Sequence, residues 1–293
     1  MKPHLLAACA VGLTAVAGAA SAGEVEIRDA VARVVVIPEA GRTRIDVEIV
    51  PGGANLPALQ VTRRGDDVRI DGDLRRRIRN CRGSGDGHFG PTEVPAGVTV
   101  DVRGHGQVRV ADAPLVTIRT PMDARINAGG AIWGAIGRAD RVELGAGGCG
   151  DWTVGNVGGD LSISVGGSGD VRAGAAQDLE VAVGGSGDVR TGAVRGLDVS
   201  IGGSGDVSVA SIDGPADVAI GGSGDVVIRG GRASSLEVAI AGSGEVTLNG
   251  EAGSVEASIV GSGDVNVASV TGRIDRTVMG SGNVNVGPVR LDD

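Results

Sequence analysis

The stretch VGGSGDVR at residues 165–172 occurs again, word for word, at residues 183–190. Five near-copies follow: IGGSGDVS, IGGSGDVV, IAGSGEVT, IVGSGDVN and VMGSGNVN. The serines of the seven copies are Ser168, Ser186, Ser204, Ser223, Ser243, Ser262 and Ser281. Successive serines are therefore 18 to 20 residues apart. A period of this length indicates a repeat architecture in which each unit packs on its neighbours.

Apolar and polar positions alternate on the N-terminal side of each serine. The position three residues before the serine is always Val or Ile, and the position three residues after it is always Val. Alternation is typical of β-strands with one buried face. A unit of this length is too short for a propeller blade, which needs about 40 residues, but it matches one coil of a solenoid. We therefore predict an all-β fold, a right-handed parallel β-helix (β-solenoid) with coils of 18–20 residues.

Weaker copies of the unit extend upstream. Cys149 stands where the serine is expected, 19 residues before Ser168, and a further glycine-rich corner lies at residues 128–131. Residues 100–108 also resemble a strand–corner–strand unit. We predict a signal peptide at residues 1–22, an N-terminal β region or cap at residues 23–97, and the solenoid repeat domain at residues 98–293. A cap is expected because a bare terminal coil exposes strand edges.

The first 22 residues have the pattern of an export signal. Lys2 belongs to a short basic region, residues 5–19 are apolar or small, and Ala20-Ser21-Ala22 matches a cleavage site. An apolar run of this length is short for a membrane span, which needs about 20 residues. The alternative is a lipoprotein cleavage box at residues 6–9, with Cys9 as the lipidated residue. Both interpretations predict an exported protein, periplasmic or at the cell surface, with no membrane span in the mature chain.

Charge is distributed unevenly along the chain, whose formal net charge is −9. Residues 23–126 carry 16 Arg against 15 acidic residues, and residues 127–293 carry 10 Arg against 21. The acidic half argues against nucleic acid and anionic membranes as partners. The basic cluster Arg75, Arg76, Arg77, Arg79 and Arg82 is a candidate site for an anionic glycan or for the lipid-bound saccharide of a Gram-negative cell. The alternative is a solvated loop neutralised by acids such as Asp71 and Asp73.

Glycines before and after each serine predict a corner in which one or both residues need positive φ. The serine hydroxyl and the following acid are expected to cap backbone N–H groups there. The alternative is calcium, because the RTX motif GGxGxD also builds solenoid coils of 18 residues. The candidate ligands are Asp170, Asp188, Asp206, Asp225 and Asp264. The acid comes one residue too early for that motif and changes to Glu245 and Asn283, so we predict no metal ligand set and no cofactor.

Two further expectations concern cysteine and catalysis. Cys81 and Cys149 are a candidate disulfide, because an exported protein meets oxidising conditions. Such a bridge would be worth about 4 kcal/mol; the alternative is two small residues in glycine corners. After export the chain has no Lys and only two histidines, His88 and His105. We therefore predict no enzyme, with a polysaccharide-processing enzyme as the less favoured alternative.

The GSG-[DEN]-V corners, flanked by alternating strands behind a signal peptide, resemble the head GIN domain family of auto-transporter adhesins. The resemblance covers about residues 98–289 and rests on the seven copies between Ser168 and Val284. It implies a bacterial β-helix at the surface or in the periplasm and brings no catalytic or ligand residues. The expected function is therefore an exported, non-catalytic adhesion or interaction module. Its expected partner is a cell-surface glycan, a protein or a second copy of the chain, and not nucleic acid.

Overall fold

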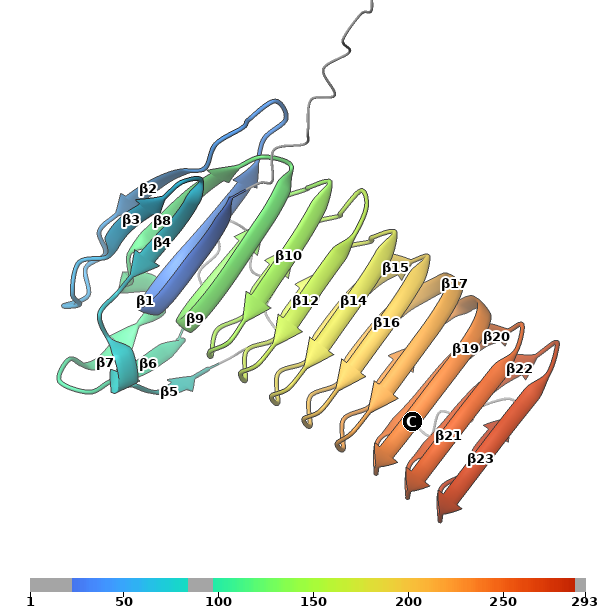
Figure 1. Ribbon diagram of the computed structural model, residues 1–293. Coiled ribbons are helices and arrows are strands. Elements are labelled where there is room, and N and C mark those ends of the chain that lie inside the picture. Colours follow the sequence, from blue (N-terminus) through green and yellow to red (C-terminus); the bar gives the residue numbers. More distant parts are fainter. Residues whose placement is uncertain (1–22, 84–96, 288–293) are drawn as a thin grey trace, which may run out of the picture.

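The computed structural model of the protein describes residues 23–83 and 97–287. This part of the chain is nearly all β-structure and forms a stack of parallel coils, about nine turns in all (Figure 1). Its only helical segments are the single 3₁₀ turns η1 (Arg75–Arg77) and η2 (Val110–Asp112). The predicted all-β parallel solenoid is therefore confirmed. The predicted signal peptide and His88 lie outside the described residues.

Most coils contribute one strand to a first parallel sheet, whose strands follow one another along the stack in Figure 1. These strands are β9 (Asp123–Ile136), β10 (Arg141–Ala146), β12 (Leu161–Val165), β14 (Asp178–Val183), β16 (Gly196–Ile201), β17 (Val207–Ile220), β19 (Gly231–Gly242), β21 (Val255–Gly261) and β23 (Ile274–Gly280). Pairing keeps equal positions of the repeat in line, so that Leu161 lies opposite Leu179 and Leu179 opposite Leu197. All three leucines are buried.

The second strand of each coil follows the corner and forms another parallel series. Its members are β11 (Trp152–Val154), β13 (Val171–Ala173), β15 (Val189–Val194), β18 (Val226–Ile228), β20 (Glu245–Ala252), β22 (Asp264–Val270) and β24 (Val284–Val286), together with the first half of β17. The valine three residues after each serine forms a continuous column here, since Val171 pairs with Val189 and Val189 with Val207. These valines are at most 1% exposed. Burying one such side chain stabilises the fold by about 1.5–3 kcal/mol.

The corner glycines are required for a reason that differs from the predicted one. Of the glycines flanking the seven serines, only Gly261 and Gly280 have positive φ. What excludes a side chain is the preceding coil. A Cβ atom built on Gly185 would lie well inside 3.0 Å of the carbonyl oxygen of Gly167, and one on Gly167 would meet Gly148 in the same way. Glycine is therefore kept because successive coils bring their backbones into direct contact.

The stack begins earlier in the chain than the repeat does. Strand β1 (Glu24–Pro38) pairs in parallel with β9 over most of its length. On its other side it pairs in parallel with β4 (Asp67–Asp71) and β8 (Leu115–Thr120). A sheet of the solenoid thus crosses the predicted boundary at residue 97, because residues expected in the cap form an inner coil. The division into domains stays a prediction.

The predicted solenoid unit at residues 100–108 is wrong. These residues belong to β6 (Thr99–Val102) and β7 (Gly106–Arg109), which form an antiparallel hairpin and, with β5 (Ile78–Arg82), a separate three-stranded sheet. This sheet packs on the outer side of the first coils, where Val31, Ala131 and Trp133 form an apolar cluster with Val100 and Val102. Alternation alone did not distinguish a hairpin from a coil, because both have one buried face.

The two ends of the stack are protected differently. At the N-terminal end, β2 (Asp46–Val50) and β3 (Gln60–Arg64) run antiparallel to β8 and β4 and pair with them. At the other end, β23 is exposed throughout its length. Its residue Arg276 pairs with the buried Ala257 and so occupies an inward column that is apolar in the preceding coils. An inward charge on a terminal strand is a known protection against edge-to-edge association.

The corner packing can be tested with two neighbouring glycines. We expect Gly185→Ala to destabilise the protein by at least 2–3 kcal/mol (an order-of-magnitude estimate), because its methyl group would overlap the carbonyl oxygen of Gly167. Gly184→Ala is the matched control, because a Cβ atom there has nothing within 4 Å. Thermal unfolding of both variants measures the difference. Equal melting temperatures would contradict the proposed role of the close contact.

Candidate functional site

A basic groove lies on the N-terminal cap. It has a volume of about 700 Å³ and is lined by Arg75, Arg76, Arg77, Arg103, Gly104 and His105. The first three come from η1 and the others from the turn between β6 and β7. The cluster predicted from sequence is therefore divided. Arg75, Arg76 and Arg77 line the groove, whereas Arg79 and Arg82 lie on β5 and do not.

Backbone hydrogen bonds hold the two sides of the groove together. Leu74, directly before η1, is buried, and its N–H donates to the carbonyl of Asp29 at 2.9 Å. The N–H of Arg103 donates to the carbonyl of Arg77 at 2.8 Å, which attaches the hairpin turn to η1. Asp73 and Arg75 have φ values of 50° and 44°. This left-handed conformation is unfavourable for residues other than glycine.

The arginines of the groove have few acidic partners. Arg75 lies 3.4 Å from the carboxylate of Asp73, and both side chains are largely exposed. Asp71 pairs instead with Arg28 at 2.6 Å. The backbone N–H of Asp73 and then the Arg28 guanidinium hold the pKa of Asp71 below its usual range. Of the two acids expected to neutralise the cluster, one therefore points elsewhere.

Three of the arginines lining the groove, Arg76, Arg77 and Arg103, form no ion pair or side-chain hydrogen bond with any described residue. Arg82, outside the groove, lies 3.5 Å from Asp101. The guanidinium groups of the groove are thus available to an external anion, while that of Arg82 already has a partner.

Sequence reasoning missed Arg103 and His105 as members of this site. His105 Nδ1 donates to the carbonyl of Asn55 at 2.8 Å, which leaves Nε2 as its second polar atom. Both residues are about 30 positions from η1 in the chain, and the hairpin that brings them close was expected to be a solenoid coil. No local pattern in the sequence marks this contact.

The acids that follow the corners form a hydrogen-bonded column. Each carboxylate accepts, through Oδ1, a bond from the backbone N–H of the equivalent residue in the next coil. The bonds run from Asp170 to Asp151 at 3.0 Å, Asp188 to Asp170 at 2.9 Å, Asp206 to Asp188 at 3.0 Å, Asp225 to Asp206 at 2.9 Å, Glu245 to Asp225 at 2.8 Å and Asn283 to Asp264 at 2.7 Å. These bonds offset the repulsion of acids stacked about 4.8 Å apart. The predicted capping by the acid thus acts between coils.

The column is interrupted where Glu245 replaces aspartate. The longer side chain of Glu245 reaches past the corner, and its Oε1 accepts from Thr247 Oγ1 at 2.6 Å and from Asn266 Nδ2 at 2.7 Å. The exchange of Asp for Glu in this copy therefore redirects the carboxylate to the side chains of the following strands.

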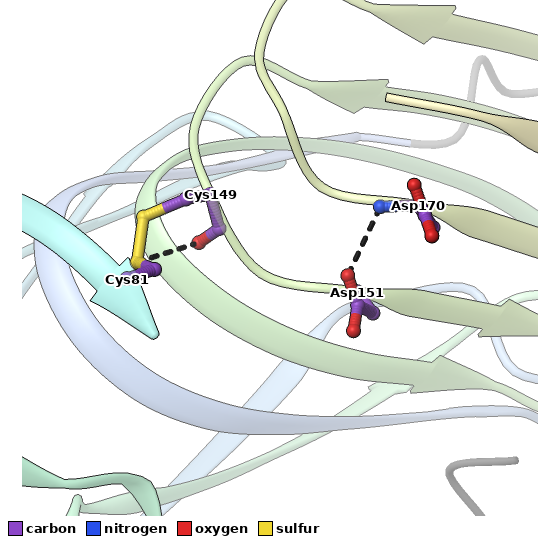
Figure 2. The surroundings of a disulfide bond; sticks show 4 residues. All are labelled: Cys81, Cys149, Asp151 and Asp170. Atoms are coloured by element: carbon purple, nitrogen blue, oxygen red, sulfur yellow. Dashed lines mark hydrogen bonds between the residues drawn. A yellow bond between two sulfur atoms is a disulfide. The ribbon is translucent and has the colours of Figure 1, made fainter. Parts of the chain in front are cut away.

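Asp151 is the buried member of the column (Figure 2). Its side chain is within a residue that is 5% exposed, and its Oδ2 has no hydrogen-bond partner among the described residues. Burial raises the pKa of Asp151, against the effect of the Asp170 N–H, and the charge of Asp170 adds to the increase. An ionised carboxylate at this position therefore costs stability.

Calcium remains a hypothesis for Asp170, Asp188, Asp206, Asp225 and Asp264. In the described part of the chain, no group of three or more His, Cys, Asp or Glu side chains could hold a metal ion. All five candidates also use one carboxylate oxygen for a backbone N–H. The carboxylates therefore already have a structural role that needs no cation.

Cys81 and Cys149 are joined by a disulfide, with their Cα atoms 6.1 Å apart (Figure 2). The bond connects β5 of the cap to the corner before β11, across 68 residues of chain. It therefore attaches the sheet that carries part of the groove region to the solenoid stack.

Replacing Asp151 tests the cost of its buried charge. Because its pKa is raised, the folded protein binds the proton more tightly, so stability falls as pH rises through the titration of the folded state. We expect Asp151→Asn to raise the melting temperature at pH 7–8 by about 2–4 °C, equivalent to roughly 1 kcal/mol. This gain should shrink as the pH is lowered below about 4, the ordinary carboxyl pKa.

Asp206→Asn is the control, because Asp206 makes the same backbone bond while exposed to solvent. Calorimetry across the pH range compares the two. The same pH-dependent gain in both variants would contradict an effect of burial.

The calcium hypothesis has its own test. We expect the melting temperature of the exported chain to be the same with millimolar calcium and with chelator, because the carboxylates are bonded to backbone N–H groups. A site filled to 100 times its Kd would add about 2.7 kcal/mol, or several degrees. A calcium-dependent rise of that size would establish an ion site in the column.

Comparison with known proteins agrees with the architecture. Among the described residues, no helix is long and apolar enough to span a bilayer. No curated protein matches the chain. A crystal structure described as a putative adhesin from Bacteroides fragilis is similar, with 14% identity and a TM-score of 0.38, covering 90% of this chain and 92% of that one. A family model described as "putative auto-transporter adhesin, head GIN domain" matches residues 33–211 and 209–290. The chain, with its GSG corners and stacked coils, belongs to this family.

Proposed function

We propose that the protein is an exported adhesion module without catalytic activity, in which the stack is a rigid support and the N-terminal cap is the contact end. About nine coils spaced about 4.8 Å apart give a stack of roughly 40 Å. Family membership supports the adhesive role. The predicted export, to the periplasm or the cell surface, belongs to the same proposal.

One observation carries the assignment of the contact end. The basic groove lies on the cap, at one end of a stack whose residues 127–293 carry 10 Arg against 21 acidic residues. Repulsion by the acidic stack would turn an anionic surface toward the cap. A saccharide of a cell envelope that carries negative charge is therefore the proposed partner.

The repeated positions of the stack already have structural roles. The valines of the repeat are buried, the glycines allow contact between coils, and the acids bond to backbone N–H groups. These roles account for the repeat without catalysis. A non-catalytic function is therefore preferred to a polysaccharide-processing one.

Adhesion can be measured with the protein immobilised on beads. We expect beads carrying residues 23–293 to adhere to surfaces coated with bacterial envelope saccharides, and beads carrying an unrelated acidic protein of similar size not to adhere. Absence of adhesion to every saccharide tested would contradict the adhesive role. The same saccharides incubated with the protein should show no new reducing ends or unsaturated products, and either product would contradict the non-catalytic role.

A further inference from the structure

We propose that the groove of Arg75, Arg76, Arg77, Arg103 and His105 binds the carboxylate or phosphate groups of an acidic saccharide chain. This inference rests on the proposed adhesive function and assigns it a site and a ligand class. Its volume of about 700 Å³ lies within the range of small-ligand sites, which is about 300–1,000 Å³.

The side chains lining the groove suit oxyanions. A guanidinium group is planar and can donate two parallel hydrogen bonds to one carboxylate or phosphate. Arg76, Arg77 and Arg103 have no acidic partner among the described residues, so binding an anion breaks no ion pair at these three positions. The groove therefore offers several donors to adjacent charged sugar units.

The backbone of the groove indicates a specialised loop. Asp73 and Arg75 are two of the three residues other than glycine with positive φ in the described chain. Such a conformation costs about 1–3 kcal/mol per residue and is found preferentially at functional sites. On the opposite side, Gly104 has φ +86° and nothing within 4 Å of a Cβ position, which leaves that side of the groove open.

Charge, and not stacking on sugar rings, would provide the recognition. Trp133 and Trp152 are the aromatic residues in the described part of the chain, and both are at most 4% exposed. The acidic faces of the stack disfavour a long polyanion such as nucleic acid or a flat anionic bilayer, because either would extend over them. A saccharide with spaced charges can occupy the cap alone.

Two double variants with the same change in net charge test the site. We expect Arg76→Ala with Arg103→Ala to weaken binding of polygalacturonate at 0.15 M salt (a condition near ~8 Å screening) by at least about tenfold. Arg79→Ala with Arg82→Ala is the matched control, because both residues belong to the same sequence cluster but lie outside the groove. We expect the control to change affinity by less than about threefold. Titration calorimetry gives the affinities, and unchanged melting temperatures show that both variants are folded.

The remaining outcomes are also decisive. Equal losses in the two double variants would overturn the site in favour of general charge attraction, and no loss in either would overturn it outright. Neutral dextran should not bind. A phosphorylated mannan in a parallel titration shows whether phosphate replaces carboxylate, and failure of both anionic polymers to bind would overturn the inference. Beads that adhere to envelope saccharides with either double variant would leave the adhesive function intact and reject only the groove.

Discussion

The close approach of successive backbones at the glycine corners is the constraint on which the rest of the structure depends. A Cβ atom on Gly167, Gly185 or Gly203 would overlap a carbonyl oxygen of the coil before it. Because the coils meet at this distance, the strands on either side of the corner stay in register from coil to coil. The valine columns then become continuous and bury one another. The repeat is therefore a requirement of packing between coils, and each coil is stable only beside its neighbours.

The same register brings equal charges close together, and the acids of the corner show how the fold accommodates them. A column of carboxylates would repel itself, but each Oδ1 accepts a backbone N–H from the following coil. An acid at this position is thus part of the hydrogen bonding of the stack. Asp151 marks the limit of this arrangement, because burial raises its pKa while one of its oxygens has no partner in the described structure.

The cap differs from the stack in composition, in strand direction and in charge. Its antiparallel strands cover the first coil, and its separate sheet packs on the outer face of β1 and β9. It also bears the basic groove, whereas the last coil ends in the inward Arg276. One end of the molecule thus offers charged groups to a partner, and the other end is arranged against joining a second copy.

The repeat in the sequence by itself determined the solenoid, because seven copies with buried valines at fixed offsets allow no other packing of coils this short. Arg75, Arg76 and Arg77 could be recognised as a cluster because they are adjacent in the chain. Only the tertiary structure placed Glu24–Pro38 inside the stack, turned residues 100–108 into a hairpin, and brought Arg103 and His105 to the groove. The physical reason is that local alternation reports which face of a strand is buried, whereas pairing partners and strand direction depend on contacts between residues far apart in the chain.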